Sequence, residues 1–326
     1  MSALMASVEN IKSGNKGYEL SCEFRGFPVS FVNALRRICL SNIPTVCVKD
    51  VQILENTTQM PHEMLRHRTE MIPINVRPDD VSVIRDAKIE LRILPSKENR
   101  TITTDDFVVE SGRDGVIMKD RDFNTPSIFL RVRAGEKVHI TGRLSLETVS
   151  GISQVCTATT WWVVDPELAK KERKTWVDAG KDPREFDNFY VQRCYFRDEN
   201  NRPTTIGMSI ESVGVLKSKE ILEMAVKILK KKIDEYIAYA LEHIQRIPND
   251  EGSFKIHSNT VGYTEGYLLQ QELYTDQNLN FVSFDLVHPL MKDTILKMNT
   301  AKTAESVLKS AKDSIEEYCS IVEKVL

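Results

Sequence analysis

The chain has 326 residues, of which 41% are hydrophobic and 28% charged, a composition that excludes a globally disordered protein. Its 44 Lys and Arg side chains are outnumbered by 47 Asp and Glu, so the formal net charge is −3. Proteins that grip nucleic-acid phosphates usually carry a basic excess, so we expect this chain to reach nucleic acid only indirectly, through partners.

The six cysteines form no CxxC pair, and we expect them to be reduced side chains in a protein core. The sequence shows no apolar leader and no run of about 18 apolar residues that could cross a membrane. These features predict a soluble intracellular protein without a membrane contact.

The first part of the chain alternates strands with helices. Residues 17–25 have a strand pattern, and residues 29–42 place Phe31, Leu35 and Ile38 at helical intervals. The region that follows predicts a helix at 60–68 and strands at 46–54, 88–94, 128–133, 137–148 and 155–164. The polar segment 95–127 is expected to be a long loop with short strands, and the charged segment 165–187 a surface excursion.

A strand at 205–213 and a long helix at about 217–245 come next. The helix carries an apolar stripe at every third or fourth position, formed by Leu222, Ala225, Leu229, Ile233, Tyr236 and Ala240. Pro248 and Gly252 then mark a break near 246–252.

After the break the same order of elements returns in compact form. Strands are predicted at 253–257, 280–287 and 294–298, and helices at 262–274 and 301–326. The last helix has apolar residues at alternating spacings of 4 and 3, close to a heptad seam, at Ala304, Leu308, Ala311, Ile315, Tyr318, Val322 and Val325. The chain is therefore a structural repeat with weak sequence identity between its halves.

Motifs in the first half resemble the α-type subunits of multisubunit RNA polymerases, which include the archaeal D subunit and the third-largest subunit of RNA polymerase II. In chain order they are Asn33-Ala34-Leu35-Arg36-Arg37, Glu55-Asn56-Thr57-Thr58, His62-Glu63, His67-Arg68, Ile72-Pro73-Ile74 and Ser209-Ile210-Glu211-Ser212-Val213-Gly214. Their order along the chain is the order expected for that family.

The second half resembles the smaller partner of that family, the archaeal L subunit. Its helix motif matches at Thr264, Gly266, Leu268, Leu269, Glu272 and Leu273, and its strand and turn match at Phe281, Asp285, His288, Pro289 and Leu290. One chain that carries both halves resembles the polymerase subunits of large DNA viruses.

The resemblance implies an α+β fold with a dimerisation module and a β-rich inserted domain. We expect residues 1–45 and 190–245 to form the first part of the module, and 253–326 its second half. Residues 46–189 would be the insert, and 246–252 a linker. Because the linker is short, the halves should pair within the chain. The packing residues would be Leu222, Leu229, Ile233, Tyr236, Leu268, Leu269, Leu308, Ala311, Ile315 and Tyr318.

The implied function is a non-catalytic platform that assembles a DNA-directed RNA polymerase for transcription. Its partners would be the two large catalytic subunits and smaller polymerase subunits. The residues expected to bind a large subunit are Asn33, Arg36, Arg37, Glu63, His67 and Arg68. A viral polymerase subunit would be found in virions and host cytoplasm, and a cellular one in the nucleus.

We expect no cofactor and no bound metal. His62 and His67 are five residues apart, which puts them about 140° apart on a helix, so they do not form a zinc-binding HExxH pair. The chain also has no cysteine from 48 to 155, where some relatives hold a metal, and no carboxylate cluster that could hold the two Mg²⁺ ions of polymerisation. Two alternatives remain: an unrecognised enzyme, and a transcription factor that binds DNA directly.

Overall fold

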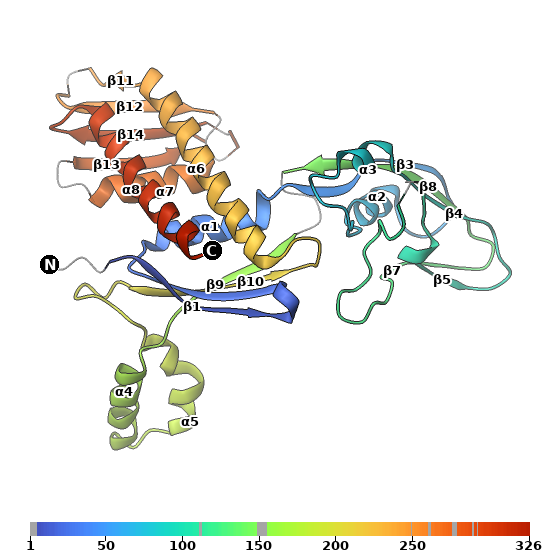
Figure 1. Cartoon of the computed structure of the whole chain (residues 1–326), viewed down its shortest axis with the longest axis horizontal. Helices are drawn as coiled ribbons and strands as arrows, with labels where there is room; N and C mark the ends of the chain where they lie inside the picture. The colour runs from blue at the N-terminus through green and yellow to red at the C-terminus, as the bar shows by residue number, and fades with distance from the viewer. Residues whose placement is uncertain are drawn as a thin grey trace. The chain divides into compact units, whose positions relative to one another are not determined.

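The computed structural model describes residues 5–110, 113–148, 155–248, 250–259, 262–275, 279–288, 290–291 and 293–326. They form two compact units. The first contains Met1–Cys39, Ala158–Ile210 and Lys219–Leu326, and the second contains Leu40–Thr157 and Glu211–Ser218. Helices and strands are mixed in both (Figure 1), which confirms the predicted α+β class.

The first half of the first unit is built on one four-stranded sheet. The sheet has the order β1-β2-β10-β9 and contains β1 (Ser7–Gly14), β2 (Glu19–Arg25), β9 (Cys156–Trp162) and β10 (Thr205–Ser212). A 3-10 turn, η1 (Asn15–Gly17), connects β1 to β2. Helix α1 (Val29–Ser41) follows β2, and the long helix α6 (Ser218–Glu242) follows β10.

The second half of this unit repeats that plan. Its sheet has the order β11-β12-β14-β13 and contains β11 (Gln245–Arg246), β12 (Ser253–Ser258), β13 (Leu279–Leu286) and β14 (Thr294–Thr300). Its helices are α7 (Tyr263–Thr275) and α8 (Ala304–Val325). The strands and helices predicted for this half occur in the predicted order, and β11 is additional. Asn249 of the predicted linker and Pro289 of the predicted turn lie outside the described residues.

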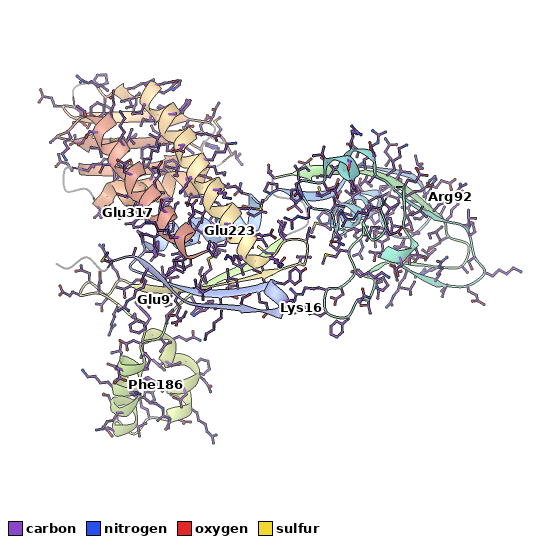
Figure 2. All side chains as sticks on the ribbon, in the orientation of Figure 1. Glu9, Lys16, Arg92, Phe186, Glu223 and Glu317 are labelled. Carbon is purple, nitrogen blue, oxygen red and sulfur yellow. The ribbon has the colours of Figure 1, made fainter. Side chains whose placement is uncertain are left out.

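The charged excursion between β9 and β10 is helical. It contains α4 (Pro166–Asp178), α5 (Pro183–Glu185), a π-helix η3 (Phe186–Tyr190) and a 3-10 turn η4 (Val191–Arg193). Asp165 caps α4 by accepting from the backbone N–H groups of Glu167 and Leu168. The excursion has a small core of its own around Phe186, which is 3% exposed (Figure 2).

The second unit, called the insert below, is rich in β-strands. A sheet of order β3-β8-β4-β6 contains β3 (Thr45–Asn56), β4 (Lys88–Ile93), β6 (Val108–Glu110) and β8 (Val138–Glu147). Strands β5 (Arg100–Thr103) and β7 (Ile128–Val132) form a second sheet. The connections contain α2 (His62–Glu70), α3 (Val81–Asp86) and a 3-10 turn η2 (Thr104–Asp106).

The insert ends earlier than the sequence indicated. We expected it to extend to residue 189, whereas the second unit ends at Thr157 and is completed by Glu211–Ser218. The physical reason is strand pairing, because β9 lies beside β10 in the sheet of the first unit. The insert has its own buried core, which includes Leu65, Leu91 and Ile140.

Candidate assembly surface

Helix α1 turns one face to the core and the opposite face outward. Phe31, Leu35 and Ile38 are 0% exposed, as their helical spacing predicts. On the outer side Asn33 and Arg37 are exposed and Arg36 is partly exposed. The residues predicted to bind a large subunit on this helix are therefore available at a surface of the first unit.

Asn33 holds the side chain of Arg36 in place. The Nε and Nη2 atoms of Arg36 donate to the Asn33 Oδ1 atom at 3.1 and 2.9 Å. A guanidinium that is already oriented loses less conformational entropy when it binds a carboxylate. The Asn33–Arg36 pair is thus a preorganised cation on α1.

Arg37 makes a contact that the sequence did not predict. Its Nε atom donates to the Thr264 hydroxyl at 2.8 Å, and Thr264 belongs to α7 of the second half. The two helices correspond to each other in the repeat, so this hydrogen bond joins equivalent elements. Arg37 thus contributes to the contact between the halves and also lies on the exposed face of α1.

The other predicted binding residues lie on α2, in the second unit. Glu63 and His67 are exposed. Arg68 is bound within the insert, because its Nε and Nη2 atoms donate to the carbonyl oxygens of Phe129 and Ile128 at 3.0 and 3.2 Å. The structure therefore gives Arg68 a role in holding α2 to β7.

The apolar residues predicted to pack the halves together are buried in the first unit. Nine of them are at most 5% exposed, namely Leu222, Leu229, Ile233, Tyr236, Leu268, Leu269, Leu308, Ala311 and Ile315. The tenth, Tyr318, is partly exposed and lies with its ring centroid 5.4 Å from that of Phe31 and 5.7 Å from that of Phe27. Tyr318 of the second half thus joins an aromatic cluster of the first.

The long helix α6 lies beside α8 of the second half (Figure 1). Ion pairs join the two helices: Lys230 pairs with Glu323 at 2.5 Å, and Asp234 pairs with Lys312 at 2.7 Å. Lys232 pairs with Glu265 of α7 at 2.5 Å. The partners in each pair are far apart along the chain, so no local sequence pattern predicts them.

Two carboxyl groups of α7 are buried. Glu265 is 4% exposed and binds Lys232 through Oε1, whereas its Oε2 accepts no hydrogen bond from any described residue. Glu272 is 6% exposed, and its Oε1 likewise has no partner among the described residues. Burial raises the pKa of Glu272 to about 7, because the charged form is poorly solvated there.

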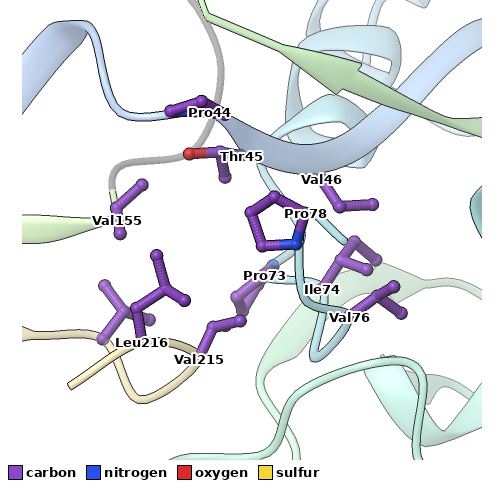
Figure 3. Close-up of a pocket in the computed structure, with 11 residues that line it drawn as sticks. Pro44, Thr45, Val46, Pro73, Ile74, Val76, Pro78, Val155, Val215 and Leu216 are labelled. Atoms are coloured by element: carbon purple, nitrogen blue, oxygen red, sulfur yellow. The ribbon is translucent and has the colours of Figure 1, made fainter. Parts of the chain in front are cut away.

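A small apolar pocket lies in the second unit (Figure 3). Pro44, Pro73 and Pro78 line it together with aliphatic side chains, and Thr45 brings a hydroxyl group. None of the described residues that line this pocket has a titratable side chain. The pocket therefore offers apolar contact rather than acid–base chemistry.

In the part of the chain that the structure describes, metal-ligating and nucleophilic side chains lie apart from one another. Among the described residues, no three His, Cys, Asp or Glu side chains lie close enough to hold a metal ion. All six cysteines are buried, and burial raises the pKa of Cys22, Cys156 and Cys319 to about 12, so their thiols are poor nucleophiles. The absence of a metal from the working protein stays a prediction. Within the described part of the chain, no helix is long and apolar enough to span a membrane.

Two family models match the chain, both described as the RNA polymerase Rpb3/Rpb11 dimerisation domain, at residues 21–233 and 253–325. Subunit Rpo3 of the DNA-directed RNA polymerase of Methanocaldococcus jannaschii is 27% identical over 216 residues, covering 64% of this chain and 84% of that protein. Rpo3 of Pyrococcus furiosus is 24% identical over 269 residues, covering 72% and 97%. A conjugation stage-specific protein of Tetrahymena thermophila is 24% identical over 303 residues, covering 72% and 94%.

Proposed function

Because the chain belongs to the family of the RNA polymerase Rpb3/Rpb11 dimerisation domain, we propose that it is the assembly platform of a DNA-directed RNA polymerase and recruits the two large catalytic subunits. The chain is a non-catalytic component of such a polymerase and carries both dimerisation domains. Smaller polymerase subunits are further proposed partners, and the chain reaches nucleic acid only indirectly, through its partners.

The observation that carries this proposal is that helices of the two family domains contact each other in the first unit. Helix α6 of the first half is bound to α8 and α7 of the second by the Lys230–Glu323 and Lys232–Glu265 ion pairs. Buried apolar residues of both halves accompany these pairs. Two separate subunits must find each other before they can offer a joint surface, whereas tethered halves meet at a high effective concentration.

The outer face of α1 is the part of this platform that we propose for a large catalytic subunit. Asn33 fixes the guanidinium of Arg36, and Arg37 lies on the next position of the exposed face. Planar guanidinium groups bind carboxylates through two parallel hydrogen bonds, which gives both affinity and orientation. Glu63 and His67 on the insert are proposed as further contacts.

The proposal is tested by reconstitution. A tagged full-length chain is co-expressed with the two large catalytic subunits of the polymerase from the same source, and the complex is isolated and assayed for RNA synthesis. Both large subunits should be retained in stoichiometric amounts, and RNA synthesis should need all three chains. Retention of neither large subunit, or RNA synthesis by the isolated chain, would end the platform proposal.

The fused arrangement also supports a finer proposal about where the protein works. Its resemblance to the polymerase subunits of large DNA viruses favours a viral transcription protein, located in virions and in viral factories of the host cytoplasm. A cellular polymerase subunit would instead be nuclear. Quantitative mass spectrometry of purified virions and of nuclear fractions separates these two locations.

A further inference from the structure

One face of the insert sheet carries three positive charges in a row. The strand register places Lys49 of β3 opposite Arg143 of β8, and Arg143 opposite Lys88 of β4. Residues directly opposite in antiparallel strands point to the same face with their Cβ atoms about 5 Å apart. Like charges at such positions repel each other, so this row lowers the stability of the folded insert.

The row lines an open groove with about 1520 Å³ of empty space, and Arg66 of α2 lines it as well. Lys49 pairs with Glu70 at 3.6 Å. Within the part of the chain that the structure describes, Arg66, Lys88 and Arg143 form no ion pair and no side-chain hydrogen bond. The groove therefore holds three cations that make no direct ion pair with any described residue.

Carboxylates surround this row of cations. Asp50, Glu70, Glu90 and Glu110 also line the groove, and Glu110 of β6 lies opposite Lys88. Four acidic side chains thus match the four basic ones. A nucleic-acid strand, with a negative charge at every phosphate, would meet these carboxylates along its length and be repelled. A protein segment can instead place single carboxylates over the cations and basic or neutral groups beside the acids.

We propose that this groove docks an acidic segment of another polymerase subunit, with a carboxylate of that segment bound by Arg143, Lys88 and Arg66. This inference rests on the proposed function, which makes the partner a polymerase subunit. The acidic character of the docked segment is inferred from the cations of the groove. The Arg66 and Arg143 guanidinium groups offer bidentate contacts, and the Lys88 ammonium adds a point charge between the strands. A bound carboxylate would also relieve the repulsion within the row.

A docking role and a structural role predict opposite effects of removing a charge from the row. Arg143→Gln takes away repulsion and keeps a polar side chain on an exposed position. We expect the melting temperature of this variant to equal or exceed that of the wild type, while partner binding falls. A lower melting temperature together with unchanged partner binding would assign Arg143 to the fold and overturn the proposal.

The affinity test uses the full chain and the reconstituted polymerase. Arg143→Glu should weaken the binding of the partner subunit to this chain at least tenfold. Its matched control is Arg92→Glu, since Arg92 is exposed on the same strand as Lys88 but does not line the groove (Figure 2). If both variants weaken binding equally, the effect is one of net charge and the groove is not the docking site. If Arg143→Glu does not weaken binding, the groove lies outside the interface, and the platform proposal is unaffected.

A peptide assay tests the groove even if the chain recruits no large subunit. A fluorescein-labelled hexapeptide with a single glutamate among serine residues is titrated with the wild-type chain, Arg143→Glu and Arg92→Glu. The same peptide with glutamine in place of glutamate is the neutral probe, and a single-stranded oligodeoxynucleotide is the competitor. We expect saturable binding of the glutamate peptide by the wild type and by Arg92→Glu, and at least a tenfold loss in Arg143→Glu. An acidic protein segment is refuted as the ligand if the peptide does not bind, if Arg143→Glu leaves its binding unchanged, or if the oligonucleotide displaces it at lower concentration than the unlabelled glutamate peptide does.

Discussion

Arg37 and Thr264 connect the two halves of the chain, since the Arg37 Nε atom donates to the Thr264 hydroxyl at 2.8 Å across 227 residues of sequence. The same arginine lies on the α1 face that we propose for a large catalytic subunit. The hydrogen bond fixes one edge of the guanidinium and so orients the side chain. If the α1 face recruits a large subunit as we propose, that recruitment and the contact between the halves are coupled through one residue.

Two substitutions distinguish the role of Arg37 in the contact between the halves from its proposed role in binding a large subunit. Arg37→Ala removes one exposed hydrogen bond and should lower the free energy of unfolding by about 1 kcal/mol or less. If Arg37 also binds a desolvated carboxylate of a large subunit, its loss should weaken that complex by about 2–5 kcal/mol. Chemical denaturation measures the first quantity and titration of the large subunit the second.

Thr264→Val is the matched control, because it removes the hydrogen-bond acceptor and leaves the guanidinium in place. It should reproduce the small loss of stability and only a fraction of the loss in binding. If Arg37→Ala assembles with the large subunits as well as the wild type does, Arg37 serves the contact between the halves alone.

The packed seam between the halves gives a second prediction. Leu308 and Ile315 are both 0% exposed on α8. Aspartate at either position would bury a charge without a partner and should cost several kcal/mol of stability. We expect Leu308→Asp to be insoluble or to lose cooperative melting, measured by circular dichroism, whereas Ser310→Asp on the exposed face of α8 should melt like the wild type.

The spacing of apolar residues predicted the helices and strands that bury one face in the core. Helices α1, α6 and α8 were predicted because their buried residues recur at helical spacing. Strand β1 was missed, since SVENIKSG has no buried residue and lies at the edge of its sheet. Helix α4 was missed for a related reason: none of its residues is buried, and charged side chains dominate its sequence.

The candidate site was predictable only in part. Local motifs placed Asn33, Arg36 and Arg37 on the outer face of one helix. The partners of these residues and of the α6 lysines depend on tertiary structure. Thr264 is remote from Arg37 along the chain, and Glu265 is 33 residues from Lys232. A single sequence contains no local signal for such contacts, and the same holds for the Lys49–Arg143–Lys88 row, which strand register creates.

A third prediction concerns the linker at 246–252. A protease site introduced there should allow the chain to be cut into two fragments that remain together at micromolar concentration. The buried residues of α6, α7 and α8 and the three ion pairs between the halves should hold them. Size-exclusion chromatography after cleavage provides the measurement, and free separation of the fragments would show that the tether, rather than the packing, keeps the halves paired.

The last prediction follows from the buried carboxyl group of Glu272. Burial raises its pKa to about 7 in the folded protein, above the usual value of about 4.3 that it regains on unfolding. Between these values the folded state binds more protons than the unfolded state, so the stabilisation is complete below the unfolded pKa and is lost as pH rises through about 7. One pKa unit corresponds to about 1.4 kcal/mol, so the loss should be at most about 3–4 kcal/mol.

Glu272→Gln removes the titrating group and keeps the shape of the side chain. The variant should match the wild type near pH 5, where the wild-type carboxyl is protonated when folded, and should exceed it in melting temperature near pH 8. Tyr318, the neighbour whose own pKa is raised to about 12 by burial and by Glu272, stays neutral throughout this range. Melting curves at intervals between pH 5 and 8 therefore isolate the carboxyl group, with Glu317→Gln, an exposed site on α8, as the control that should show no such divergence. Parallel melting profiles of Glu272→Gln and the wild type would mean that the Glu272 carboxyl is solvated.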